Sequence, residues 1–243
     1  MKIVSYNLHF GGKTGPGNQW EQMMADFAPD FVFAQESFDP QRYFSPDEFA
    51  SFKGCIWAAV PGHKWGSAIL SRCHQLESVQ VTEYEGWAIG ARVHDLVIGG
   101  VPQSAMLFSI HAPSPGPYDP VVNRILDDIK KRWDGQPLIV AGDFNITTAI
   151  RHPKEALKNT LGELKILGRL RQELGLLNAW QVLHPNQDLP QTLRWNKDPL
   201  PPYHCDAVFL NQSHLSHLRD ASIESSGVWG QLSDHNPVFV TLE

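Results

Sequence analysis

Eight polar residues of the types that enzymes use in catalysis stand at the ends of short apolar runs in this sequence. They are Asn7, Glu36, His111, Asp143, Asn145, Asp206, Asp234 and His235. Carboxylate and amide oxygens, without a zinc-like cluster of cysteine and histidine, favour a hard cation, Mg²⁺ with Mn²⁺ as the alternative. Such a cation neutralises charge that develops on a phosphoryl group. The set therefore predicts metal-assisted chemistry on a phosphate ester.

The adjacent pair Asp234-His235 raises the question of which carboxylate orients the histidine. Neighbouring residues of a strand point to opposite sides, so Asp234 is a poor partner for His235. Asp206 is the best candidate, because a carboxylate on one ring nitrogen fixes the tautomer and raises the basicity of the other. His235 would then act as a general base for water. Asn145 and His111 could donate hydrogen bonds to the phosphate oxygens.

The elements that must position these residues alternate between strands and helices. Helices are predicted over 20–28, 119–133 and 155–176, and residues 185–202 form a proline-rich loop. Strands are predicted over 3–6, 31–34, 67–71, 106–110, 138–141, 207–210 and 238–241. In layered α/β folds, strand ends meet on one rim, where a rigid sheet holds side chains from distant segments. One composite site is therefore expected.

The stretch G-G-K-T near the N-terminus resembles the end of a phosphate-binding P-loop. That motif needs a glycine five residues before Gly12, and the position holds Asn7 instead. The comparison excludes a P-loop NTPase. It leaves a glycine-rich loop directly after the Asn7 strand, beside the expected phosphate site.

Composition places the chain among ordinary globular proteins. Its 243 residues are 42% hydrophobic and 19% charged, and no boundary divides them, so one domain over 1–243 is expected. A net charge of −6 provides no general attraction for a polyanion.

Because we find no apolar run of membrane length and no signal peptide, we expect a cytoplasmic protein, and we also expect a monomer. Cys55, Cys73 and Cys205 lack paired-ligand spacing and are expected to be buried free thiols.

Seven segments in order along residues 3–240 carry a family resemblance. They read Y-N-L, A-Q-E-S, W-G-S-A-I-L-S-R, S-I-H-A-P, I-V-A-G-D-F-N, H-C-D-A-V-F and L-S-D-H-N-P-V. The set resembles the endonuclease/exonuclease/phosphatase superfamily, which includes deoxyribonuclease I, abasic-site endonucleases and neutral sphingomyelinases. The resemblance implies a four-layered α/β sandwich in which two mixed sheets pack face to face between helices. It also implies hydrolysis of phosphate esters by in-line attack of a metal-activated water.

The resemblance also assigns roles to the metal-site residues. Glu36 of A-Q-E-S matches the principal metal ligand, and Asn7 of Y-N-L matches a residue of the metal and phosphate site. Asp234 matches the terminal aspartate of the metal site.

Five further residues match catalytic positions of the family. Asp143 resembles the residue that orients or deprotonates the attacking water, and Asn145 resembles the amide that stabilises the transition state. Asp206 matches the partner of the catalytic His235, and His111 matches a second histidine that binds the scissile phosphate. Whether Asp143 or His235 takes the proton stays open.

The sequence departs from the family around the Asp206 motif. His204 stands where many relatives have arginine, and Ala207 stands where they have an aromatic residue. Asn178 replaces a frequent aspartate and is expected to be structural. For Trp195 and Trp229, packing is favoured over stacking on a ligand.

The substrate is the part that the residues determine least. A phosphodiester of nucleic acid is weakly favoured, because the chain lacks an obvious added module. The alternatives within the family are a lipid head-group phosphodiesterase and an inositol or sugar phosphatase. A non-catalytic binding module on the same fold is the alternative from another class. Because every motif residue is present, this last alternative is disfavoured.

Overall fold

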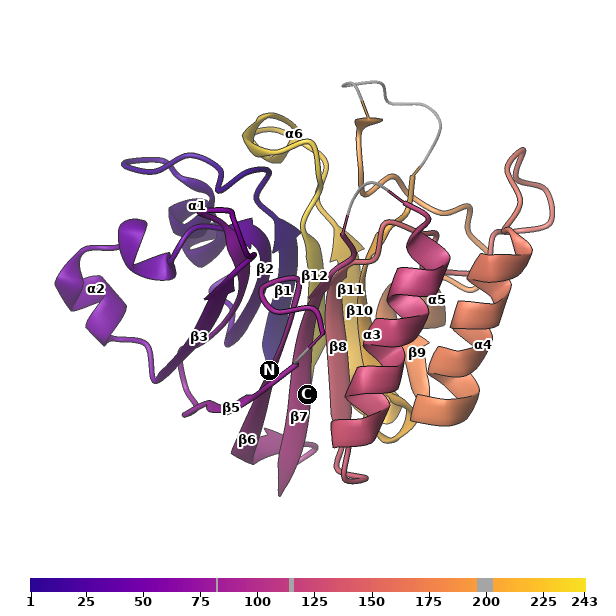
Figure 1. The fold of residues 1–243 in the computed structure, drawn as a ribbon, viewed down its shortest axis with the longest axis horizontal. Coiled ribbons are helices and arrows are strands. Elements are labelled where there is room, and N and C mark those ends of the chain that lie inside the picture. The colour runs from indigo at the N-terminus through magenta and orange to yellow at the C-terminus, as the bar shows by residue number, and fades with distance from the viewer. Residues whose placement is uncertain (82, 114–115, 196–202) are drawn as a thin grey trace.

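Two six-stranded mixed sheets form the centre of the computed structural model, which describes residues 1–81, 83–113, 116–195 and 203–243 (Figure 1). The first sheet has the strand order β11-β12-β1-β2-β4-β3, and the second has the order β5-β6-β7-β8-β10-β9. The strands are β1 Lys2–Asn7, β2 Phe31–Ser37, β3 Gly54–Ala59, β4 Gly66–Ser71, β5 Glu77–Val79, β6 Ala88–Ile98, β7 Val101–His111, β8 Leu138–Asp143, β9 Leu176–Asn178, β10 Asp206–Asn211, β11 Leu218–Ile223 and β12 Val238–Leu242.

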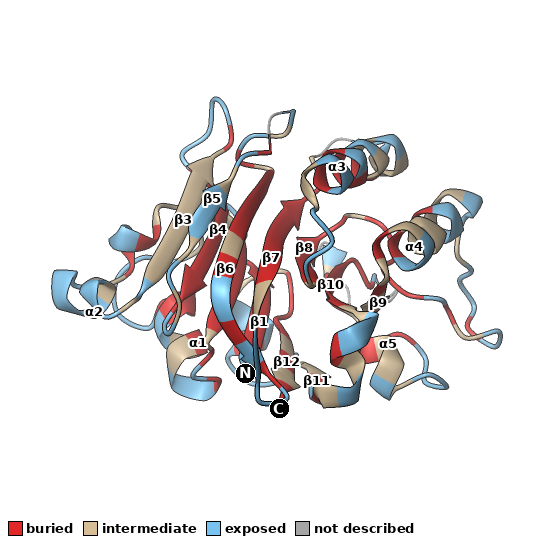
Figure 2. Cartoon of the chain, turned by 90° about the horizontal axis from the view of Figure 1, so that it is seen from below, coloured by how far each residue is buried: buried red, intermediate tan, exposed pale blue. Residues whose placement is uncertain are grey.

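Helices cover the outer faces of both sheets. They are α1 Gln19–Asp26, α2 Pro46–Ala50, α3 Tyr118–Arg132, α4 Leu161–Leu174, α5 Ala179–Leu183 and α6 Trp229–Leu232, with 3₁₀ turns at Pro40–Arg42 and Gln212–His217. Seen from below, α3 and α4 lie on one side of the buried strands, and α1 lies on the opposite side (Figure 2). No helix in the described ranges has both the length and the apolar character needed to cross a bilayer.

The period of two along each strand builds the layers. In β8, Leu138 and Val140 pack against α3 and α4, whereas Ile139 and Ala141 face the other sheet. The residues between the sheets form one apolar cluster, and a third cluster joins the first sheet to α1 through Trp20. Three clusters between four layers confirm the predicted α/β sandwich.

Two parallel strand pairs place the polar strand ends on one rim. β1 runs parallel to β2, with Asn7 opposite Gln35, and β7 runs parallel to β8, with His111 opposite Asp143. β10 is antiparallel to β8, so its first residue, Asp206, lies opposite Asp143. Because the carboxyl ends of parallel strands meet at one edge, the two sheets bring their catalytic-type residues together.

Every predicted strand is present, but the helix expected over 155–176 is shorter. It begins at Leu161, where the Thr160 side chain and Glu163 form a capping box, and it ends before Gly175 in the left-handed conformation. Upstream, Glu155 instead forms a buried ion pair with Arg151. The structure also contains β3, β5, β6, β9 and β11, which the pattern did not predict. Residues 196–202 of the expected loop lie outside the described residues.

The cysteines are free thiols, as expected, but only one of them is buried as predicted. Cys205 is buried, Cys55 is half-buried and Cys73 is exposed. Burial, followed by the carboxylates of Asp143 and Asp206, holds the pKa of the Cys205 thiol well above its usual value. Cys205 is therefore a neutral group next to the site.

Gly142, next to Asp143, is a glycine that the rim geometry requires. It has a φ of 140°, and an added Cβ would overlap the carbonyl oxygen of its strand partner Ile110. We predict that Gly142→Ala lowers the free energy of unfolding by about 3 kcal/mol, because it adds both backbone strain and overpacking. Urea denaturation measures this change.

Gly168 provides the matched control for that variant. It lies within α4, where an added Cβ would meet no heavy atom within 4 Å. Gly168→Ala should raise the free energy of unfolding by up to about 1 kcal/mol, because alanine is the better helix former. Equal stability of Gly142→Ala and the parent would contradict the account of Gly142.

Candidate active site

Asn7 joins the two sheets at the centre of the site. Its Nδ2 donates to Asp143 Oδ2 at 3.1 Å and to Glu36 Oε1 at 3.3 Å. Its Oδ1 accepts the backbone N–H of His9 at 2.9 Å. Asn7 ends a strand of one sheet, and Asp143 ends a strand of the other. The buried Asn7 amide therefore links the two sheets and fixes the distance between the carboxylates of Glu36 and Asp143.

Glu36 is held in an uncommon backbone conformation. Its φ is +50°, in the left-handed region that costs a residue with a side chain free energy. The Phe10 N–H donates to Oε2 at 2.6 Å, and Oε1 lies 3.5 Å from His111 Nε2. The strain turns this carboxylate away from the strand direction and into the group formed by Asn7 and His111.

His235 lies between two buried aspartates. Its Nδ1 is 2.9 Å from Asp206 Oδ2 and 3.1 Å from Asp206 Oδ1, which is the pairing expected from the sequence. Its Nε2 is 3.8 Å from Asp143 Oδ2. That separation is too long for a hydrogen bond, but a water molecule beside both atoms could bond to each of them. The backbone N–H of Asp206 donates to Thr192 Oγ1 at 3.0 Å and fixes the start of β10.

The charges of these three residues are strongly coupled. Burial alone would lower the pKa of His235, but the carboxylates of Asp206 and Asp143 outweigh it and raise that pKa to about 10. Burial, followed by the charge of Asp206, raises the pKa of Asp143 to about 7. At neutral pH the imidazole is charged, and Asp143 is close to its titration point, where an acid–base group is most effective.

His111 is a neutral donor. Burial, with a smaller contribution from the charge of His235, lowers the pKa of His111 to about 3. Its ring lies 5.0 Å from Trp87 and 5.9 Å from Trp65, between centroids. Its Nε2 faces Glu36 and Asp143, at 3.5 and 3.8 Å. Because this imidazole is uncharged, it forms no ion pair with the two carboxylates. Its N–H can therefore bond to an oxygen anion of a ligand.

Asn145 follows Asp143 in a tight turn. Its backbone N–H donates to Asp143 Oδ1 at 2.9 Å, and its φ is +52°. Its Nδ2 donates to the carbonyl oxygen of Ala112, at the end of the His111 segment, at 2.8 Å. The amide is therefore fixed from both sides and half-buried at the rim, where its second N–H can reach a ligand.

Asp234 lies at the outer edge of the site and is partnered by His9, which sequence reasoning missed. Asp234 Oδ1 is 3.0 Å from His9 Nδ1, and its side chain is 28% exposed. His9 lies two residues after Asn7, so the structure links Asp234 to the Asn7 end of the first sheet. The only sequence signal for a role of His9 was its place in the glycine-rich loop after that strand.

Arg194 is the second residue that sequence reasoning missed. Its backbone N–H donates to the Asp234 carbonyl at 2.7 Å. Its guanidinium donates to the carbonyl oxygens of Ser233 at 2.5 Å and His235 at 3.4 Å, and to the Asn236 side chain. This single side chain fixes the backbone on which Asp234 and His235 stand.

Comparison with known proteins identifies the family. A model of the endonuclease/exonuclease/phosphatase family matches residues 4–235. The chain belongs to this family. It is therefore a hydrolase that acts on phosphate esters. A search of curated proteins found no match.

Solved structures of low sequence identity share the family fold. An AP endonuclease from Archaeoglobus fulgidus is 16% identical, with a TM-score of 0.71 and coverage of 100% of this chain and 99% of that one. The 3′ phosphatase NExo from Neisseria, bound to product DNA hairpin, is 17% identical, with a TM-score of 0.73 and coverage of 100% and 99%. The catalytic domain of Xenopus laevis APE2 is 15% identical, with a TM-score of 0.75 and coverage of 100% and 91%.

Two groups of side chains in this family member could hold a cation. Ligand atoms of Asp143, Cys205, Asp206 and His235 lie within 4.8 Å of one another. However, the thiol of Cys205 is protonated and both oxygens of Asp206 bond to His235. Glu36 and Asp143 instead present carboxylate oxygens on the two sides of the Asn7 amide, and oxygen ligands fit the requirements of Mg²⁺.

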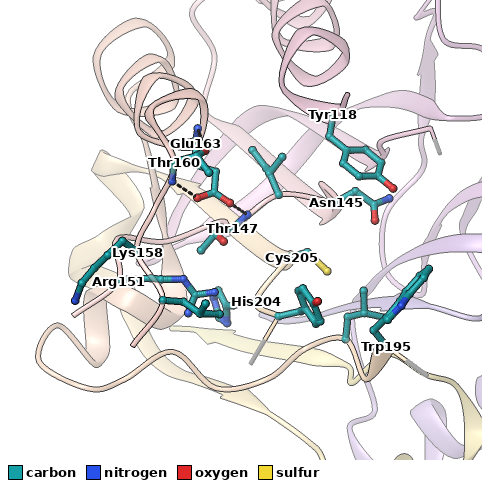
Figure 3. A pocket seen from close by; sticks show the side chains of 14 residues that line it. Tyr118, Asn145, Thr147, Arg151, Lys158, Thr160, Glu163, Trp195, His204 and Cys205 are labelled. Atoms are coloured by element: carbon teal, nitrogen blue, oxygen red, sulfur yellow. Dashed lines mark hydrogen bonds between the residues drawn. The ribbon is translucent and has the colours of Figure 1, made fainter. Parts of the chain in front are cut away.

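A pocket of about 340 Å³ adjoins this part of the family site. Asn145 and Trp195 line one end of it, and Arg151 and Lys158 line the opposite end (Figure 3). Tyr203 adds a second aromatic wall. The pocket therefore begins at a predicted phosphate-binding amide and continues between aromatic side chains.

The departures from the family pattern have structural explanations. His204 is buried, with Nδ1 bonded to the Pro190 carbonyl at 2.9 Å, and Ala207 lies in the core. Asn178 caps α5 and donates to the Thr148 carbonyl at 3.1 Å, so it is structural, as expected.

The two tryptophans near the site differ from each other. Trp229 is buried and stacks on Phe27 with ring centroids 5.1 Å apart, in agreement with the packing role expected for it. Trp195, for which packing was also expected, is 60% exposed at the pocket. The neighbouring side chain of Arg194 bonds to Ser233, His235 and Asn236, whereas the indole ring of Trp195 lies at the surface.

Proposed function

We propose that the chain is a Mg²⁺-dependent phosphodiesterase that cleaves nucleic acid. The observation that carries the proposal is the buried gap of 3.8 Å between Asp143 Oδ2 and His235 Nε2, beside Asn7 and Glu36. A water that bonds to both atoms would lie beside this pair, next to the proposed site for a hard cation. Because residues from Asn7 to His235 of one copy supply the whole set, we also propose that residues 1–243 act as one domain and as a monomer.

Glu36, Asn7 and Asp143 are the proposed ligands of Mg²⁺, with Asp234 able to add a carboxylate at the outer edge. When bound, the cation supplies neutralisation of negative charge on the phosphoryl oxygens. The fit rests on the carboxylate oxygens of Glu36, Asp143 and Asp234. Asn7 directs its Nδ2 at Glu36 and Asp143, so it would offer Oδ1 to the cation only after its amide rotates.

The remaining chemistry is proposed for the side chains themselves. A water beside Asp143 and His235 attacks phosphorus and gives its proton to Asp143, while the charged imidazole of His235 donates a hydrogen bond to it and the bond to the leaving oxygen breaks on the opposite side. Asp206 keeps Nδ1 of His235 occupied, so that Nε2 faces the water. His111 and Asn145 donate hydrogen bonds to the non-bridging oxygens as charge develops on them.

Nucleic acid is favoured over the other substrates by the walls of the pocket. A polyphosphorylated inositol would need free cations, but Arg151 is paired with Glu155 at 2.8 Å. Lys158 Nζ donates to the carbonyls of Pro153 at 2.6 Å and Glu155 at 2.5 Å. The aromatic rings of Trp195 and Tyr203 instead suit a base or sugar next to the scissile phosphate.

The function is tested with fluorescent single-stranded DNA, duplex DNA with an abasic site, and p-nitrophenyl phosphate. Each substrate is incubated with Mg²⁺ or with EDTA. We expect Mg²⁺-dependent cleavage of a DNA phosphodiester that exceeds release of p-nitrophenol from the monoester. Cleavage of the monoester alone would replace the proposal with a phosphatase. No cleavage of any substrate would favour the binding module.

Asp206→Asn tests the link between Asp206 and the acid–base pair. We expect turnover to fall roughly 10–100-fold, the usual cost of losing a group that orients another. Asp206 raises the pKa values of both His235 and Asp143, so its neutralisation lowers both. The limb of the pH–rate profile that rises with pH should therefore move to lower pH. A slower enzyme with an unmoved limb would argue against the pairing.

A further inference from the structure

The loop that follows Asn7 is a strained left-handed turn. Four consecutive residues, His9 to Gly12, have φ values of +56°, +54°, +88° and +63°. Glycine adopts this region easily, but His9 and Phe10 carry side chains that clash there. A protein keeps such a conformation only where its surroundings enforce it, and these places cluster at functional sites.

Contacts with Glu36 hold the turn in place. The Phe10 N–H donates to Glu36 Oε2 at 2.6 Å, and the Gly11 N–H donates to the Glu36 carbonyl at 2.5 Å. The Gly12 N–H closes the turn on the His9 carbonyl at 3.0 Å, and the Tyr43 hydroxyl bonds to the Gly11 carbonyl. The turn is thus fixed to a proposed metal ligand, and the Phe10 side chain extends away from these contacts.

Phe10 presents its ring to solvent at the edge of the active site. The side chain is 60% exposed. Its centroid lies 6.1 Å from that of Trp65, which in turn lies 5.9 Å from the ring of His111. Two ring contacts therefore separate Phe10 from the histidine proposed to hold the scissile phosphate.

The exposed aromatic side chains of the described residues gather at this site. Among the large hydrophobic side chains that the described ranges expose, the aromatic ones are Phe10, Trp195 and Tyr203. Trp195 and Tyr203 line the pocket beside Asn145, and Phe10 stands at Glu36. The others are aliphatic. This distribution favours a ligand with flat faces, because nucleobases stack on exposed aromatic rings.

We propose that Phe10 is a specificity-determining residue that stacks on a nucleobase next to the scissile phosphate. The inference rests on the proposed action on nucleic acid. In this assignment, Phe10 contacts the nucleobase that adjoins the scissile phosphate on the Glu36 side of the site. The contacts of the turn fix the Phe10 backbone before the substrate binds, so less conformational freedom is lost on binding.

Binding of a fluorescein-labelled oligothymidylate tests the inference. Fluorescence anisotropy gives the Kd in the presence of Mg²⁺, with His235→Ala as the parent to limit hydrolysis. Phe10→Ala in this parent should raise the Kd about 5–100-fold, the range for loss of one stacked base. Phe10→Trp should bind at least as tightly as the parent. Val101→Ala, which truncates another exposed side chain, should leave the Kd unchanged.

A labelled oligomer of abasic sugar phosphates separates base contacts from backbone contacts. Phe10→Ala should bind this oligomer as the parent does, because the stacking partner is missing from both complexes. An equal loss on the abasic oligomer and on oligothymidylate would overturn the proposal in favour of a backbone contact. An unchanged Kd for oligothymidylate would overturn it outright.

Phe10→Gly provides a readout that a merely structural ring would not give. Glycine relieves the left-handed strain, so the thermal unfolding midpoint should rise while the oligothymidylate Kd rises as well. A lower midpoint would overturn the assignment of strain to a binding role.

If the wild-type enzyme cleaves DNA but Phe10→Ala binds normally, this inference alone fails. If the parent binds no oligonucleotide and the wild type cleaves no diester, the proposed function fails with it.

Discussion

His235→Ala is expected to lower the turnover of a DNA phosphodiester by about 10²–10⁴-fold, the range for loss of a general acid–base group. The variant removes the ring nitrogen that faces Asp143 across 3.8 Å and leaves the attacking water with one partner instead of two. Turnover is measured at saturating substrate and Mg²⁺, so that weaker binding does not contribute. A turnover within a few-fold of the wild type would remove His235 from the mechanism.

The controls for this variant address its buried surroundings. Removal of the imidazole leaves Asp206 without its partner, which can destabilise the fold. His235→Asn keeps an amide donor at the position of Nδ1 for Asp206 but lacks Nε2, so it should lose a similar factor in turnover with a smaller loss of stability. His94→Ala removes an exposed histidine paired with Glu77, and turnover should be unchanged because surface pairs contribute little.

Glu36→Gln is expected to weaken Mg²⁺ binding at least as much as the roughly 10–100-fold loss seen when a group that supports a ligand is changed. Glutamine keeps the shape of the side chain and an oxygen for the Phe10 N–H, but it lacks the charge that binds a hard cation. Calorimetric titration of the protein with Mg²⁺ gives the affinity directly. The Mg²⁺ concentration for half-maximal cleavage should increase in parallel.

Glu77→Gln is the matched control for Glu36→Gln, because it makes the same change at an exposed position. Its Mg²⁺ affinity should equal that of the wild type. If the Mg²⁺ titration of Glu36→Gln also matched the wild type, Glu36 would not be a ligand. The group of Asp143, Asp206 and His235 would then become the candidate for the cation.

The sandwich was implied by the family resemblance, whereas the approach of the polar residues could be predicted from the sequence for one physical reason. Asn7, His111 and Asp143 each end an apolar strand, and parallel pairs must align such ends. Their motifs are local, so a short stretch of sequence contains each one. The partner of His235 followed from the opposite directions of adjacent strand side chains, and the hydrogen bond to Asp206 is present.

Other features depend on contacts that no local pattern records. Arg194 bonds mainly to backbone carbonyls about forty positions away in the chain. Strand β6 escaped prediction because a register shift between Val93 and Leu96 breaks its alternation. The outward placement of Phe10 depends on a turn fixed by Glu36, which comes from another strand.

The position of β1 between β12 and β2 has a consequence during protein synthesis. Strand β1, which carries Asn7, pairs with both, and the N-terminal amine donates to the Leu242 carbonyl at 2.5 Å (Figure 1). A ribosome-bound chain that has not yet been made as far as Leu242 lacks both His235 in its final position and one neighbour of β1. Such a nascent chain lacks the complete group of polar residues at the rim and therefore cannot hydrolyse a phosphate ester.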